Sequence, residues 1–130
     1  MTKITSFLKF IFHISTLLLI ILSLFPGSLL GYLFYGDFSA QPHLIENPYG
    51  TSINHFIIYI YVSLLGFFIY AKSTSFKKIV YELFFLSIVL EILQLIIPNR
   101  SFQIVDLISN ILGVFVAYCL VKIYLFLNKL

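Results

Sequence analysis

Long apolar stretches alternate with short polar segments along this chain of 130 residues. Four stretches reach or approach the roughly 20 apolar residues with which a helix crosses a lipid bilayer. They cover residues 10–35, 53–71, 79–97 and 104–125. The first is interrupted by Pro26-Gly27, a pair that we expect to kink the helix there. The pattern therefore predicts an all-α membrane protein, a bundle of four transmembrane helices forming one domain over residues 1–130.

The connecting segments differ in charge, and this difference predicts the orientation. Residues 36–54 are rich in turn formers and contain no Lys or Arg, whereas residues 72–78 contain three lysines. Both ends of the chain are also basic, and residues 98–101 form a tight turn with one arginine. Because positively charged flanks stay on the cytoplasmic side, we expect a multi-pass protein with both the N-terminus and the C-terminus in the cytoplasm.

Composition excludes several other classes of protein. Hydrophobic residues make up 61% of the chain and charged residues 10%, with a mean hydropathy of +1.06. A soluble domain is about 45–50% apolar and about 25% charged, so this chain has too few charges for a water-facing surface. The net charge is +3, but the basic residues lie at the ends of apolar stretches rather than in a stripe, so we expect no nucleic-acid partner.

The N-terminal stretch and the metal-binding residue types allow two further interpretations. The first apolar stretch continues to about Tyr35, well beyond the ~7–15 residues of a signal-peptide core, so we interpret it as an uncleaved first span. A single cysteine, Cys119, with three scattered histidines makes no thiolate-type metal site. We therefore expect no cofactor and no dedicated metal site.

Ionisable and amide side chains inside the stretches are informative, because a carboxylate near the centre of a membrane helix costs about 2.5–3.5 kcal/mol. Glu91 and Gln94 lie one turn apart near the outer end of the third stretch. Asp106 and Asn110 lie one turn apart near the outer start of the fourth. We expect a polar pocket that opens to the outer leaflet. Its expected residues are His55, Glu91, Gln94, Arg100, Asp106 and Asn110.

Small residues predict where helices approach one another closely. The expected packing positions are Gly27, Gly31, Gly66, Gly113 and Ala117. Gly27 and Gly31 have the spacing of a small-residue contact face, which fits either a homodimer interface or packing within one chain. The alternatives differ in whether crosslinking at Ser28 yields a dimer.

The polar positions of the last two stretches resemble the VanZ-like family of small bacterial membrane proteins. The matching residues, on two helices joined by a proline-containing turn, are Glu91-x-x-Gln94, Arg100-Ser101, Asp106, Asn110 and Gly113. The resemblance extends over about residues 54–117 and includes His55. It departs from the family where Thr51 and Ser52 replace an Asp-Lys pair and where Ala117 replaces a glycine.

The resemblance implies a protein of the bacterial inner membrane. Better-studied relatives lower susceptibility to lipoglycopeptide antibiotics such as teicoplanin, so it also implies a role in modifying the cell envelope. The implied partner is a membrane lipid, a lipid-linked envelope precursor or a lipoglycopeptide.

Three functional hypotheses remain open. In the first, Arg100 binds the phosphate or carboxylate headgroup of an amphiphile; the structural alternative is that it neutralises Asp106 or Glu91. In the second, an enzyme uses His55, Glu91 and Asp106 as metal ligands or as acid and base on a lipid-linked phosphate, although a lone histidine at a helix start more often binds a loop. In the third, a small dimeric transporter moves protons through Glu91.

Overall fold

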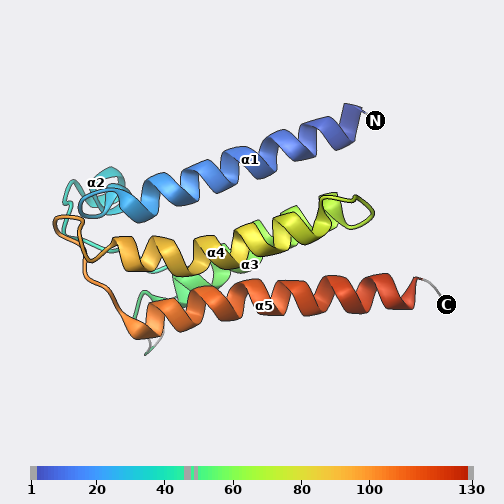
Figure 1. The fold of residues 1–130 in the computed structure, drawn as a ribbon. Coiled ribbons are helices and arrows are strands. Elements are labelled where there is room, and N and C mark those ends of the chain that lie inside the picture. Colours follow the sequence, from blue (N-terminus) through green and yellow to red (C-terminus); the bar gives the residue numbers. More distant parts are fainter. Residues whose placement is uncertain (1–2, 46–47, 49, 129–130) are drawn as a thin grey trace.

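The computed structural model describes residues 3–45, 48 and 50–128; Glu46 of the polar segment and Lys129 of the basic C-terminus lie outside this part. The described chain is all-helical, as expected, with five helices and no strand. They are α1 (Lys3–Leu24), α2 (Leu29–Tyr35), α3 (Ser52–Tyr70), α4 (Phe76–Leu93) and α5 (Ile104–Leu127). The four long helices lie alongside one another, and the short α2 lies at one end of the bundle beside the end of α1 (Figure 1).

The expected kink in the first apolar stretch is a complete break. α1 ends at Leu24, and Gly27 then adopts a left-handed φ of +85°. Pro26 has no N–H to continue the helix, and its ring clashes with the preceding turn. A new helix starts after Ser28, whose side-chain hydroxyl accepts a hydrogen bond from the N–H of Gly31 at 2.9 Å. The single span expected over residues 10–35 is therefore α1 alone, followed by a turn and α2.

Because of this break, the contact face expected for Gly27 and Gly31 does not form. Gly27 lies in the turn outside both helices. Gly31 is buried in α2, where a Cβ atom would fall 1.8 Å from the carbonyl oxygen of Ala40. The missing side chain thus lets the following loop pack on α2 within the same chain.

Three of the described helices, α1, α3 and α5, are long and apolar enough to cross a membrane, with 22, 19 and 24 residues. α4 has 18 residues but carries Lys77, Lys78, Glu82 and Glu91, which make it less apolar. It is also displaced from the expected range of 79–97, since Gln94 is its C-terminal cap and the chain then turns. The C-terminal end of α4 therefore lies closer to Glu91 than the sequence pattern predicted.

The core of the bundle is densest where α5 packs against α3. A Cβ atom on Gly113 would fall 2.8 Å from the carbonyl oxygen of Phe56 and 2.9 Å from the Cβ of Tyr59. Ala117, one turn further along α5, is completely buried. Gly66 has a different neighbour, the ring of Phe12 from α1, at 2.6 Å from its would-be Cβ. Close approach of α5 to α3 sets the distance between the polar side chains that these two helices carry.

Replacing Gly113 with alanine tests this packing. The added methyl meets backbone atoms of α3 that cannot rotate away, so we expect Gly113→Ala to lower the free energy of unfolding by about 1–3 kcal/mol. Thermal unfolding of the purified protein in detergent measures the effect. Leu112→Ala, at the neighbouring exposed position, is the control and should change little. Equal melting temperatures for wild type and Gly113→Ala would contradict the close contact.

Candidate functional site

α3 and α5 begin and α4 ends at one end of the bundle (Figure 1), and these helix ends carry the polar side chains of the site. His55 lies in the first turn of α3, and Glu91 lies in the last turn of α4. Asp106 and Asn110 lie in the first two turns of α5. Because α4 runs antiparallel to both α3 and α5, these positions share one level although they are far apart in sequence.

The side-chain amide of Asn110 connects three helices. Its Nδ2 atom lies 3.4 Å from the carbonyl oxygen of Ser87 and 3.4 Å from Oε2 of Glu91. A carbonyl oxygen only accepts, so this end of the amide is the NH₂ group and Oδ1 is the acceptor. Oδ1 lies 3.0 Å from Nδ1 of His55. The imidazole therefore carries its proton on Nδ1 and donates it to Asn110.

Both carboxylates are buried and each is held by a further donor. Glu91 is fully buried, and its Oε1 atom accepts a hydrogen bond from the backbone N–H of Gln103 at 3.1 Å. Asp106 is 4% exposed, and its Oδ1 atom accepts from the hydroxyl of Ser52 at 2.5 Å. Sequence reasoning missed both donors. Ser52 could have been noticed in the sequence, since it stands where the VanZ-like pattern has a lysine. A backbone N–H such as that of Gln103 leaves no trace in the sequence.

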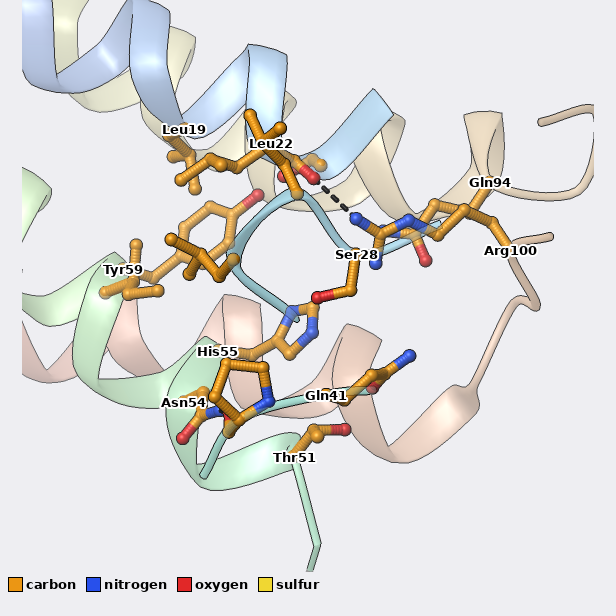
Figure 2. Close-up of a pocket in the computed structure, with 15 residues that line it drawn as sticks. Leu19, Leu22, Ser28, Gln41, Thr51, Asn54, His55, Tyr59, Gln94 and Arg100 are labelled. Atoms are coloured by element: carbon orange, nitrogen blue, oxygen red, sulfur yellow. Dashed lines mark hydrogen bonds between the residues drawn. The ribbon is translucent and has the colours of Figure 1, made fainter. Parts of the chain in front are cut away.

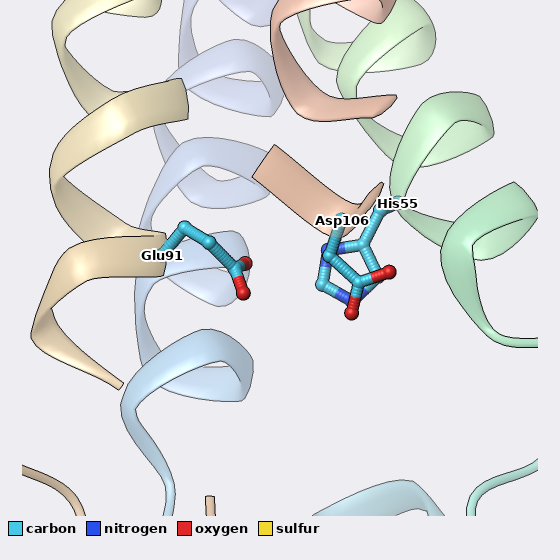
Figure 3. A group of neighbouring side chains, drawn as sticks. All are labelled: His55, Glu91 and Asp106. Atoms are coloured by element: carbon cyan, nitrogen blue, oxygen red, sulfur yellow. The ribbon is translucent and has the colours of Figure 1, made fainter. Parts of the chain in front are cut away.

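His55, Glu91 and Asp106 converge on one point between the helices (Figure 3). One nitrogen or oxygen atom from each of the three lies within 4.8 Å of the others. Nε2 of His55 and Oδ2 of Asp106 are 3.6 Å apart. This distance is too long for a normal hydrogen bond. The three residues of the enzymatic hypothesis are thus brought together, although their sequence spacing matches no metal-binding motif.

Arg100 reaches the site from the turn between α4 and α5. Its backbone N–H donates to the carbonyl of Ile97 at 3.2 Å, across a turn in which Asn99 has a left-handed φ of 59°. Proline followed by a left-handed residue is the arrangement of a type II turn. Pro98 and Asn99 thereby fix where the arginine side chain starts.

The Arg100 side chain forms neither of the ion pairs considered from the sequence. No carboxylate of the described residues lies within 4.0 Å of it, and it instead caps the C-terminal end of α1. Its Nη2 atom donates to the carbonyl of Leu22 at 2.6 Å, and its Nε atom donates to the carbonyl of Phe25 at 3.0 Å. Leu22 would ordinarily receive the N–H of residue 26, which is a proline and has none. The arginine replaces this missing donor and places a positive charge at the negative end of the helix dipole.

Burial lowers the pKa of the Arg100 guanidinium from its ordinary value, and the nearby negative charge of Glu91 opposes this effect. The ordinary pKa of arginine is so high that the group stays protonated. Arg100 is therefore a fixed positive charge near Glu91, although the two side chains form no ion pair within 4.0 Å.

A cavity of about 120 Å³ lies between this arginine and the start of α3 (Figure 2). Of the six residues expected from the sequence, His55, Gln94 and Arg100 line it, while Glu91, Asp106 and Asn110 lie in the buried network behind His55. Its apolar wall consists of Leu19, Leu22, Leu29, Leu30, Pro42, Ile58 and Tyr59; further polar lining comes from Ser23, Ser28, Gln41, Thr51 and Asn54.

The loop wall of the cavity is attached to α3 through Asn54. The side-chain amide of Asn54 donates to the carbonyl of Pro42 at 2.8 Å and accepts from the N–H of Leu44 at 2.9 Å. The loop is thus tied to the residue that immediately precedes His55.

Fold and site together define a small all-helical membrane protein with a buried polar cluster at one end of its bundle. The chain belongs to the VanZ-like family: the family model described as VanZ/LLP1 matches residues 5–126, nearly the whole chain. The match extends the resemblance found over about residues 54–117 to α1 and to most of α5. No curated protein and no solved structure matches the chain.

A double-mutant cycle tests whether Arg100 compensates for Pro26. We expect Arg100→Ala to lower the free energy of unfolding by about 1–3 kcal/mol, because it leaves two partly buried carbonyls without a donor. In a Pro26→Ala background residue 26 regains its N–H, so the same substitution should cost clearly less. Unfolding of the four proteins in detergent, compared pairwise, measures the coupling.

The control for this cycle is Lys78→Ala, which removes an exposed surface partner of Glu82. Its cost should be small and identical in both backgrounds. Strictly additive effects of Arg100→Ala and Pro26→Ala would show that the two positions act independently.

Proposed function

We propose that this protein spans the bacterial inner membrane four times, with both termini in the cytoplasm and the polar cluster on the outer side. α4 supports a fourth span, since it lies alongside the three apolar helices (Figure 1). The start of α1, the α3–α4 connection and the end of α5 lie at one end of the bundle, and the α4–α5 connection, whose sequence includes Arg100, lies at the other. All lysines of the described residues belong to those three basic regions. This asymmetry is the one that favours a cytoplasmic position for the lysine-rich end.

At the outer end, the protein binds the headgroup of an anionic cell-envelope amphiphile. The observation that carries this proposal is Arg100, which lines the cavity while only two of its N–H groups are used on α1. A guanidinium has further donors, and its planar fork suits the oxygens of a phosphate or carboxylate. The apolar wall beside it, from α1, α2 and α3, suits the first carbons of a lipid chain.

The size of the cavity restricts the ligand. At about 120 Å³ it is smaller than the roughly 300–1,000 Å³ of sites that enclose drug-sized ligands. A phosphate-sized group fits this space better than a whole lipoglycopeptide. Lower teicoplanin susceptibility would then follow from action on an envelope lipid or lipid-linked precursor rather than from direct capture of the antibiotic.

An enzyme acting on a lipid-linked phosphate is the second candidate function. It is favoured by one observation, namely that His55 both lines the cavity and lies 3.6 Å from the buried carboxylate of Asp106. With its proton on Nδ1, a neutral imidazole presents Nε2 as a base. The dimer that the transporter hypothesis requires is not supported by a shared Gly27 and Gly31 helix face, since Gly27 lies in the turn before α2.

Filling the cavity tests headgroup binding. We expect dodecyl phosphate to bind the full-length protein in maltoside micelles and to bind Ile58→Phe at least about tenfold more weakly, because the larger ring occupies the cavity. Ile123→Phe makes the same change at an exposed position of α5 and should bind like wild type. Isothermal titration calorimetry measures the affinities.

The same variants can be compared in cells. In a Gram-positive host with matched membrane levels, protection against teicoplanin should be present with wild type and Ile123→Phe and reduced with Ile58→Phe. Equal binding of dodecyl phosphate to wild type and Ile58→Phe would refute the cavity as the headgroup site.

Cysteine accessibility tests the orientation. In a Cys119→Ser background, a membrane-impermeant maleimide added to intact cells should label His43→Cys, which lies in the lysine-free loop. Ser73→Cys, in the basic connection between α3 and α4, should be labelled only after the membrane is opened. The reverse pattern would invert the topology.

A further inference from the structure

We propose that His55, Glu91 and Asp106 form a binding site for one divalent transition-metal ion, of the Zn²⁺ type. The three side chains come from three different helices and point into one space (Figure 3). This inference does not depend on which headgroup the cavity binds.

Two hydrogen-bond acceptors face each other at the centre of the cluster. The proton of a neutral His55 ring is on Nδ1, where it is donated to Asn110, so Nε2 carries a lone pair. Oδ2 of Asp106 lies opposite, 3.6 Å away. A doubly protonated ring would be expected to donate to the carboxylate at about 2.7–2.9 Å instead. Two lone pairs turned toward each other in a buried site are stabilised by a cation between them.

The separation of the two facing atoms also fits a bound metal ion. Zinc bonds to histidine nitrogen and carboxylate oxygen are about 2.0–2.2 Å long, so two ligands of one tetrahedral ion lie roughly 3.4 Å apart. The 3.6 Å between Nε2 of His55 and Oδ2 of Asp106 is close to this separation. A carboxylate oxygen of Glu91 completes the group within 4.8 Å, and the Glu91 side chain has to shift toward the other two atoms to bind the same ion.

The charge of the two buried carboxylates also favours a bound cation. Glu91 and Asp106 are both buried, and no Lys or Arg of the described chain lies within 4.0 Å of either carboxylate. The nearby Arg100 donates instead to Leu22 and Phe25. Two buried carboxylates without a paired charge are costly. A divalent ion would balance them.

Each candidate ligand is also held by a hydrogen bond from outside the cluster. Asn110 holds His55 through Nδ1, the N–H of Gln103 holds Glu91, and the Ser52 hydroxyl holds Asp106. Such contacts orient ligands and fix the histidine tautomer in metal sites. The bonds to His55 and Asp106 leave Nε2 and Oδ2 facing each other, and Oε2 of Glu91 also lies 3.4 Å from Nδ2 of Asn110.

The ligand set indicates the kind of ion. One imidazole and two carboxylates suit zinc or manganese better than calcium or magnesium, which prefer oxygen ligands alone. Three protein ligands also leave a coordination position open. Because His55 also lines the cavity, an ion bound here would lie next to the space assigned to the headgroup.

Metal titration of the full-length protein in detergent tests this site. After treatment with a chelator, we expect wild type to bind one Zn²⁺ per chain, measured by competition with a fluorescent indicator. His55→Asn keeps a donor near the position of Nδ1 and removes Nε2, and Asp106→Asn removes the carboxylate charge. Each should weaken binding at least about 100-fold, since loss of an outer contact alone costs about 10–100-fold.

His43→Ala is the matched control, because His43 lies in the loop outside the cluster, and it should bind like wild type. Helical circular dichroism and a single elution peak establish that each variant is folded. If His55→Asn fails this check, Glu91→Gln takes its place. Absence of stoichiometric Zn²⁺ binding by wild type, undiminished binding by the folded ligand variants, or loss of binding in His43→Ala would each overturn the proposal.

Discussion

The amide of Asn110 is the contact on which the polar end of the bundle depends. Through one short side chain, α5 is bonded to His55 of α3 and to both Ser87 and Glu91 of α4. Inside a bilayer no water replaces a lost partner, so such a network favours one relative arrangement of the three helices. Gly113, one turn further along α5, makes the arrangement possible because α3 approaches there without a side chain between them. Helix packing and the polar site are therefore two results of one geometry.

A second dependence links the break after α1 to the turn before α5. Pro26 removes a backbone donor, and Arg100 supplies one from a position 78 residues beyond Leu22. The same guanidinium lines the cavity, so its position is set by the helix end it caps and by the turn at Asn99. An arginine that is already held loses little conformational entropy when a ligand oxygen reaches its remaining donors.

Much of the fold and of the polar site could be predicted from the sequence, and the predictions that were wrong or incomplete share a physical cause. Spacing of three or four residues assigned Asp106 and Asn110 to one helix face, and the structure brings them together with His55 and Glu91. The pattern carried no information on backbone carbonyls, so the acceptors of Arg100 were missed. It also treated residues 10–35 as one kinked span, because hydrophobicity does not reveal where a helix loses its hydrogen bonds. VanZ-like membership, by contrast, was recognisable from a few polar positions and is confirmed.

The first turn of α3 has two tasks that adjoining residues perform. Asn54 holds the loop through Pro42 and Leu44, and His55 faces the cavity that this loop covers. The loop wall of the cavity and the imidazole of His55 are therefore both attached to the first turn of α3. The opposite side of the cavity is formed by α1 and α2. A movement of this loop away from α3 must therefore break the two hydrogen bonds of the Asn54 side chain, one residue from His55.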